Sequence, residues 1–486
     1  MPWGPGVTTD RDADPVSGDI PDPNRVVRIV DPRRSCQTAA MSNSAPTSPA
    51  PCVAVIGGAT AGAEVAGRLA ERGAVVIVFE MNPRPYGKIE DGLPRWHVAL
   101  REKEYQNVRT KLSHPNVHYV PNTKIGRDVD FKALASEWGF TSVVLANGAW
   151  RDRPLPIEGV DDYVGNGLVY QNPFIIWFNH NHEADYAGEA FETPDGAIVV
   201  GGGLASIDVV KVIMLQNAVK KLAERGVEAD LVELEVKGIP KICKQNGIEI
   251  GELGLEGPTL FYRRRVEDMP LMDVPEGADE KRVAKVEAGR ARMLGKAQEK
   301  YGFNMEPLCS PQEAIIEDGK LVGLRFVRNV MKDGRPTPTD ETFERRGPVV
   351  ISSIGSIPEA IDGIAMRGEL FDFQDWDLGR LEGYPTVFSV GNVVTGKGNI
   401  VASRKHAAQV SEEAIEKFLG LHEDREGEDA ALAATRENVE AEAQAVAEEI
   451  AAQEPASPEA IASILERVAT HQARVGYEGD LEAWLR

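Results

Sequence analysis

The sequence predicts an α/β fold with two Rossmann-like units, followed by a short C-terminal helical extension. Three observations support this prediction. Two glycine-rich turns of one type occur at VAVIGGATAGAEVA (53–66) and IVVGGGLASIDVV (198–210), and an alanine- and glutamate-rich stretch follows residue 421. The chain of 486 residues is also too long for one ordinary domain.

The first turn lies between two apolar runs. CVAVIGG and AVVIVFE suit buried parallel strands, and AEVAGRLAERG between them has helical spacing. Gly57 permits the tight turn and Gly62 permits close helix packing, although Ala59 replaces the usual second glycine. The helix N-terminus suits a pyrophosphate, and the acid that ends the second strand suits a ribose. The expected nucleotide contacts are Gly57, Gly58, Ala59, Ala61, Gly62 and Glu80.

The second turn is followed by a strand with a different ending. A long insertion, roughly residues 216–257, delays that strand, which ends in three arginines, 263–265, instead of an acid. An acid favours a free ribose 2′-hydroxyl, whereas guanidinium groups favour a 2′-phosphate. We therefore expect FAD in the first unit and NADP(H) in the second, although a solvated basic corner is the alternative interpretation. The expected contacts are Gly201, Gly203, Leu204, Ala205, Ser206, Arg263 and Arg264.

Composition excludes several classes of function. The net charge of −22 argues against nucleic acid as a partner. No apolar run approaches the roughly 20 residues that span a bilayer, and a cytoplasmic location is expected. None of the four cysteines forms a C-x-x-C pair or has metal-ligand spacing, so no metal site is expected and electron chemistry falls to bound cofactors. These cysteines are Cys36, Cys52, Cys243 and Cys309.

The two ends of the chain differ from its body. Residues 1–50 are expected to form a disordered tail, within which Met41 is an alternative start. Residues 421–486 are expected to form helices that break at Pro455, with Ser457 as the N-cap of the last long helix. These helices either dock on the body of the protein or bind a partner protein, and both interpretations stay open.

Over about residues 51–420 the chain resembles a family of flavoproteins with two dinucleotide-binding domains. This family includes the adrenodoxin-reductase-type ferredoxin–NADP reductases and the small subunit of glutamate synthase. The resemblance rests on VVLANGAWRDRPLPIEGVD, NPFIIWFNHNHE, YRRRVEDMP and VFSVGNVVTGKGNIVASRKHA. It implies that the NADP domain is inserted into the FAD domain. The expected limits are 51–150 and 350–420 for the FAD-binding domain, 151–349 for the NADP-binding domain and 421–486 for the extension.

The same resemblance implies further site residues. The stretch PYGKIEDGLPRWH falls where the family has a loop beside the flavin, and His97 stands where adrenodoxin reductases place a histidine, so His97 is the candidate catalytic residue. Two residues depart from the family pattern: Asn392 replaces a common aspartate, and Leu204 replaces a common asparagine. The additional cofactor contacts that the resemblance implies are Gly87, Gly148, Gly391, Asn392, Gly398, Asn399 and Ile400.

Together these features predict an FAD-dependent oxidoreductase. It would pass hydride from NADPH to the flavin and then single electrons to a small redox protein such as ferredoxin. One alternative is the electron-input subunit of a larger, glutamate-synthase-like enzyme. Another is a flavin-bearing scaffold or sensor with little turnover, for which the departures at Asn392 and Leu204 leave room.

Overall fold

A computed structural model describes residues 45–274, 277–395 and 429–486, although the side chains of 395 and 429–438 lie outside the description. The described residues belong to one compact unit. The disordered tail is expected to span residues 1–50. Residues 1–44, Cys36 included, lie outside the described residues, whereas Ala50 pairs with Ala456 and packs against the core, so ordered chain is present before the expected limit. Three expected cofactor contacts also lie outside the described residues: Gly398, Asn399 and Ile400.

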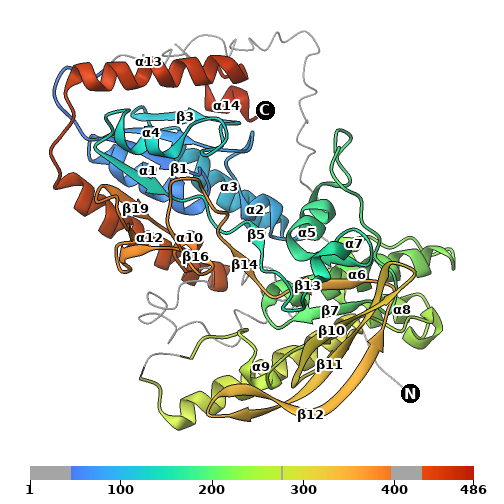
Figure 1. The fold of residues 1–486 in the computed structure, drawn as a ribbon. Helices are drawn as coiled ribbons and strands as arrows, with labels where there is room; N and C mark the ends of the chain where they lie inside the picture. Colours follow the sequence, from blue (N-terminus) through green and yellow to red (C-terminus); the bar gives the residue numbers. More distant parts are fainter. Residues whose placement is uncertain (1–44, 275–276, 396–428) are drawn as a thin grey trace, which may run out of the picture. The chain divides into compact units, whose positions relative to one another are not determined.

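Five parallel strands form the first sheet, in the order β19–β4–β1–β2–β3. Figure 1 labels β1, β3 and β19 of this sheet. They are β1 (Cys52–Ile56), β2 (Val75–Phe79), β3 (Val117–Val120), β4 (Ser142–Leu145) and β19 (Val387–Ser389). Every residue of β1 and β2 is buried, as expected for apolar runs covered on both faces. The helices of this unit are α1 (Thr60–Glu71), α2 (Lys88–Asp91), α3 (Val98–Leu112), α4 (Phe131–Ser136) and α10 (Asn392–Thr395).

The second sheet is also parallel, in the order β6–β13–β7–β8–β9. Its strands are β6 (Leu168–Tyr170), β7 (Ile198–Gly201), β8 (Thr259–Phe261), β9 (Asn304–Glu306) and β13 (Val350–Ser353). The expected insertion before β8 is helical, because α6 runs on into it and three short helices follow. The helices of this unit are η1 (Val160–Tyr163), α5 (Gln171–His180), α6 (Leu204–Ala223), α7 (Leu231–Lys237), α8 (Ile239–Gln245), η2 (Ile250–Leu253), η3 (Val266–Asp268) and α9 (Glu280–Tyr301).

The chain passes between the two sheets twice. It leaves the first sheet after β4 through β5 (Arg151–Asp152) and returns through β14 (Ser356–Ile357), and these two short strands pair antiparallel. Since β19 then completes the first sheet, the second unit is inserted into the first, and the predicted fold class is confirmed. The exact domain limits stay predictions, and β13 lies in the second sheet just beyond the expected limit at residue 349.

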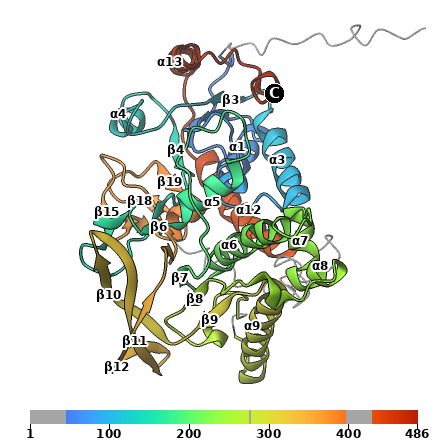
Figure 2. The same cartoon turned by 90° about the vertical axis from the view of Figure 1, so that its right-hand side faces the viewer.

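Smaller sheets complete the fold between β9 and β19. Three long antiparallel strands form a ladder in the second unit (Figure 2). They are β10 (Cys309–Glu317), β11 (Lys320–Lys332) and β12 (Arg335–Arg346). Four short strands form two hairpins before β19, namely β15 (Met366–Arg367), β16 (Leu370–Phe371), β17 (Phe373–Asp375) and β18 (Arg380–Leu381).

The C-terminal extension is helical, as expected, and it docks on the first sheet. Its helices are α12 (Asp429–Ala451), α13 (Pro458–Val475) and α14 (Leu481–Trp484), and the Ser457 side chain caps α13 by accepting a bond from the Ala460 amide at 3.3 Å. Val446 on α12 is buried against α1, and Ile464 on α13 is buried in the core on the opposite face of the sheet (Figure 1). The leucine, isoleucine and valine side chains of α13, and those of α12 from Ala443 onward, therefore pack within the chain. No helix in the described ranges is long and apolar enough to cross a membrane.

Candidate functional site

One cavity of about 310 Å³ opens at the carboxyl ends of the first sheet. It lies where ligands bind in open parallel sheets, beyond the strand ends. Residues from the first turn, the end of β2, the loop after β3, the segment after β4 and the loop after β14 line it. The structure thus brings together five of the expected cofactor contacts around one cavity: Gly57, Ala59, Glu80, Gly87 and Gly148.

The first turn needs glycine at two of its three positions. Gly57 has φ of +101°, and a Cβ there would lie 2.5 Å from the Ala146 carbonyl oxygen. A Cβ on Gly62 would lie 1.8 Å from the Gly57 carbonyl oxygen, so the helix can approach the strand only without that side chain. Ala59 is the N-cap residue of α1 in extended backbone, a conformation that tolerates a methyl group. The departure at Ala59 therefore leaves the turn intact.

Glu80 lines the cavity at the end of β2. Its Oε2 accepts a hydrogen bond from the Gly58 amide at 2.8 Å, and its Oε1 accepts one from the Asn82 amide at 2.9 Å. Burial raises the pKa of Glu80 to about 7, against the opposing effect of these amide donors. Each carboxylate oxygen keeps a further lone pair with which it can accept from a ribose hydroxyl.

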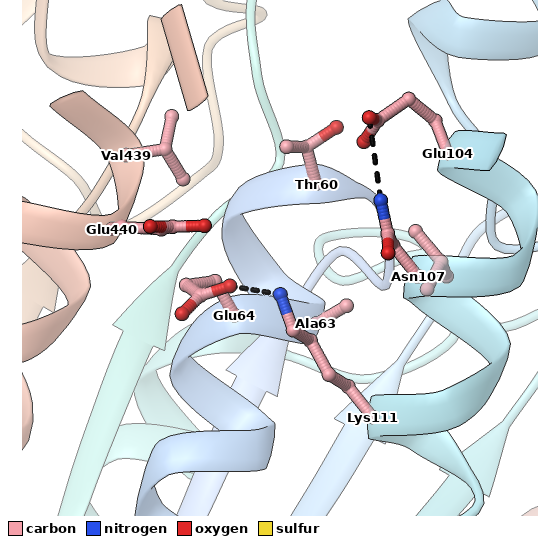
Figure 3. A pocket seen from close by; sticks show the side chains of 9 residues that line it. Thr60, Ala63, Glu64, Glu104, Asn107, Lys111, Val439 and Glu440 are labelled. Atoms are coloured by element: carbon pink, nitrogen blue, oxygen red, sulfur yellow. Dashed lines mark hydrogen bonds and ion pairs between the residues drawn. The ribbon is translucent and has the colours of Figure 1, made fainter. Parts of the chain in front are cut away.

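Residues that the sequence analysis did not single out complete the cavity. Lys124 and Glu359 both line it and form an ion pair at 2.8 Å between the loop after β3 and the loop after β14. Trp150 lines it just before the crossing strand β5. A much smaller gap of about 10 Å³ lies between α1, α3 and α12, where Lys111 pairs with Glu64, and it has room for no more than a water molecule (Figure 3).

The second turn starts a long helix with an open first turn. Nothing lies within 4 Å of a Cβ built on Gly203, and the Ser206 hydroxyl donates to the Gly203 carbonyl oxygen at 2.6 Å. Leu204 and Ala205 begin the 20-residue helix α6, and no side chain caps its N-terminus. The free amide groups of this helix end suit a phosphate, as the sequence predicts.

The three arginines after β8 differ in their contacts. Arg265 pairs with Asp268 at 2.9 Å and with Glu287 at 3.3 Å. Arg264 donates from Nη2 to the Gly334 carbonyl oxygen at 3.0 Å. The Arg263 side chain is exposed and has no hydrogen bond or ion pair within the part of the chain that the structure describes. Of the three guanidinium groups, that of Arg263 is therefore the most available to donate to a phosphate.

His97 lies in a buried polar cluster, apart from the residues that line the cavity. Its Nε2 accepts a hydrogen bond from the indole N–H of Trp96 at 2.9 Å. The Lys211 ammonium group on α6 lies 4.7 Å from the centre of the Trp96 ring and 3.0 Å from Glu235. Burial raises the pKa of the neighbouring Asp208, and Lys211 opposes that shift. The catalytic role of His97 stays a prediction, and its surroundings tie it to the second unit.

The turn after β19 carries two more expected contacts. Gly391 has φ of +75°, and a Cβ there would lie 3.0 Å from the Ala61 Cβ at the start of α1. Its amide donates to Glu442 Oε2 on α12 at 2.8 Å, and Asn392 begins α10. The turn after β19 therefore lies beside the glycine-rich turn that precedes α1, and the Glu442 carboxylate of the C-terminal extension accepts a hydrogen bond from its Gly391 amide.

The cysteines within the described ranges take no part in these sites. Cys52, Cys243 and Cys309 are buried and free. No group of three or more His, Cys, Asp or Glu residues in the described part of the chain could hold a metal ion.

Comparison with known proteins relates this chain, with its two nested units, to a class of oxidoreductases. Residues 51–237 match the family described as pyridine nucleotide-disulphide oxidoreductase. The probable mitochondrial NADPH:adrenodoxin oxidoreductase of Schizosaccharomyces pombe is 23% identical over 407 residues, which cover 76% of this chain and 82% of that protein.

Other matches are shorter or structural. Cindoxin reductase of Citrobacter braakii is 30% identical over 166 residues, and the glutamate synthase [NADPH] small chain of Bacillus subtilis is 31% identical over 170 residues. Each of these two matches spans about a third of both chains. The structure of Mycobacterium tuberculosis FprA in complex with NADPH covers 86% of this chain and 100% of that chain, at 20% identity and a TM-score of 0.54, and so shows a shared fold.

The chain is therefore a homologue of the adrenodoxin-reductase-type ferredoxin–NADP reductases and of the glutamate synthase small chain. The expected family resemblance and the expected oxidoreductase class are both confirmed.

Proposed function

We propose that this protein is an NADPH-dependent flavoprotein oxidoreductase. It binds FAD in the cavity of the first unit and NADP(H) at the end of the second, and it passes single electrons to a small redox protein such as ferredoxin. One observation carries the proposal. In the first unit, β2 is followed by Glu80, which lines a cavity, whereas in the second unit β8 is followed by three arginines, of which the first, Arg263, is exposed.

The first unit fits the nucleotide half of FAD. The cavity of about 310 Å³ is at the small end of the range for ligand sites. Gly57 of the first glycine-rich turn and the carboxylate of Glu80 both line it. The amide groups at the start of α1 would hold the pyrophosphate, and Glu80 would accept from the ribose hydroxyls. The buried lining residues of the cavity, among them Phe79 and Ile125, would shield part of the bound cofactor from water.

The second unit fits NADP(H). The open start of α6 would hold the pyrophosphate of this nucleotide, and the exposed Arg263 would pair with the 2′-phosphate. Two homologues whose names specify NADPH, the reductases of S. pombe and M. tuberculosis, align over 71% or more of this chain. Their names also specify adrenodoxin and ferredoxin, which supports a small electron carrier as the partner here.

The chemistry requires little acid–base catalysis from the chain. When bound, FAD takes up two electrons as hydride from NADPH and can release them one at a time. The residues of this chain bind, orient and shield the two nucleotides. His97 is the one group near the contact between the units that we assign to proton handling, and Trp96 holds its ring in place.

The test begins with the visible spectrum of the purified protein, followed by anaerobic titration with NADPH and then with NADH. Bound flavin that NADPH bleaches, with NADH much poorer, supports both sites. Reduction of a ferredoxin by the NADPH-reduced protein supports the electron-carrier step. Bound flavin that NADPH cannot reduce would contradict the reductase activity and favour a scaffold or sensor.

The short match to the glutamate synthase small chain favours a second candidate, an electron-input subunit of a larger enzyme. The two candidates differ in their stable partners. A free reductase purifies alone and reduces added ferredoxin, whereas an input subunit co-purifies with a larger protein that carries its own redox centres.

A further inference from the structure

Lys88 opens α2 directly after Gly87, one of the residues that line the dinucleotide cavity. Its Nζ donates to Asn172 Oδ1 at 3.2 Å and to Ser356 Oγ at 3.1 Å, and it lies 5.6 Å from the centre of the Trp150 ring. The lysine belongs to the first unit. Its partners come from α5 of the second unit and from the two crossing segments.

These partners form a closed network. Asn172 Nδ2 donates to the Trp150 carbonyl oxygen at 2.9 Å and to Ser356 Oγ at 3.0 Å. The Asn172 amide donates to the Asp152 carboxylate at 3.2 Å, and Asp152 pairs with Ser356 across the two crossing strands. The lysine therefore connects α2 to both crossings of the chain through one set of hydrogen bonds.

The network lies directly behind one wall of the cavity. Gly87 has φ of +48°, and a Cβ there would lie 2.8 Å from the Ala59 Cβ and 3.7 Å from the Trp150 ring. Gly87, Ala59 and Trp150 thus pack closely where they line the cavity. A shift of α2 would move Gly87 relative to the glycine-rich turn between β1 and α1, which contains Ala59.

We propose that Lys88 is a positioning residue for FAD, whose charged amine fixes the cavity wall formed by Gly87 and Trp150 against the crossing strands. The inference rests on the proposed function, because FAD is the nucleotide that we assign to this cavity. An apolar side chain of similar length would fill the same space but would remove a charged donor from Asn172 and Ser356.

The charge on Lys88 gives the proposal a pH signature. Burial lowers the pKa of Lys88 to about 8, and Asp152 on β5 and Asp91 on α2 act in the opposite direction. Burial also raises the pKa of Asp152, to about 6, so this carboxylate is charged wherever the lysine titrates. The lysine loses its charge as pH rises through about 8, whereas an arginine at this position stays charged.

The experiment measures FAD affinity, by flavin fluorescence, in apoprotein prepared from four forms at pH 7 and pH 9.5. The forms are the wild type, Lys88→Met, Lys88→Arg and the control Lys320→Met, which changes an exposed lysine of β11. Thermal unfolding of each apoprotein reports on folding. Glu80 titrates near pH 7 in the same cavity, but all four forms contain it, so its effect cancels between them.

We expect Lys88→Met to weaken FAD binding roughly tenfold or more at pH 7, since a hydrogen-bonded charge is lost. We expect the wild type to lose affinity between pH 7 and 9.5, Lys88→Arg to lose much less, and Lys320→Met to follow the wild type. If Lys88→Met fails to fold, Ser356→Ala provides the second test, with a smaller loss at pH 7.

Two results overturn the inference by itself. The first is equal FAD affinity of wild type and Lys88→Met at pH 7, and the second is the same pH dependence for wild type and Lys88→Arg. A wild-type protein that binds no FAD would instead contradict the proposed function, and the inference with it.

Discussion

Substitution of Arg263 separates the proposed 2′-phosphate site from a merely basic surface. Arg263 and Arg265 leave the same strand end two residues apart and are both exposed, but only Arg265 is bound to carboxylates, at 2.9 Å and 3.3 Å. We expect Arg263→Gln to weaken NADPH binding strongly, and Arg265→Gln to serve as the matched control with a small effect.

The magnitude follows from the exposure of the side chain. A hydrogen bond to a charged group contributes about 1.5–3 kcal/mol, and solvent screening at an exposed arginine favours the lower end. A loss of about 1.5–2 kcal/mol corresponds to roughly 10- to 30-fold weaker binding of NADPH. Binding of NADH, which lacks the 2′-phosphate, should change by less than about twofold.

The assay is anaerobic titration of the flavoprotein with each nucleotide, followed by the visible spectrum. Salt should weaken NADPH binding more in the wild type than in Arg263→Gln, because the pairing is electrostatic. The reasoning is refuted if Arg263→Gln binds NADPH as the wild type does, or if NADH binding falls to the same extent as NADPH binding.

Three further predictions concern buried groups. Glu80→Gln should remove a pH dependence of the unfolding free energy. Burial raises the pKa of Glu80 from 4.5 to about 7, so this group stabilises the folded wild type fully below pH 4.5. That contribution, up to roughly 3 kcal/mol, is lost as the pH rises through 7. Urea unfolding of both apoproteins at pH 5.5 and 8 checks it, and equal pH slopes would contradict it. Ile464→Ala on α13 should cost about 2–5 kcal/mol of unfolding free energy, against little change for the exposed Ser463→Ala. Lys211→Met should cost about 3–5 kcal/mol, because it leaves Glu235 buried without its ammonium partner; unfolding at one pH measures it, and a cost below 1 kcal/mol would argue against a charged pair.

The local parts of the site could be predicted from the sequence because their geometry is local. A strand, a glycine turn and a helix follow one another within thirty residues, so the place of Gly57, Gly62 and Glu80 is set by chain connectivity. The sequence also indicates the ion pair of Arg265, since an opposite charge, Asp268, stands three residues further on.

The rest depends on contacts between distant segments. The apolar face of α13 indicates that the helix packs, but not that Ile464 packs on the first sheet. Lys211 and Glu235 lie 24 residues apart on separate helices, and the pair at Lys124 and Glu359 joins segments more than 200 residues apart. No periodicity or spacing rule brings such residues together.

The contacts of α5 bear on whether the two nucleotide sites act independently. Asn179 on α5 donates to the carbonyl oxygens of Glu90 and Leu93 at 2.9 and 3.0 Å, and His180 lies 2.9 Å from Asp91. The bond to Asp91 raises the pKa of His180, which strengthens this contact at lower pH. The segment that leads from the cavity wall towards His97 is thus bonded to a helix of the inserted unit. A rigid-body movement of that unit would carry this segment with it, so occupation of the proposed NADP site should alter the proposed FAD cavity through these bonds.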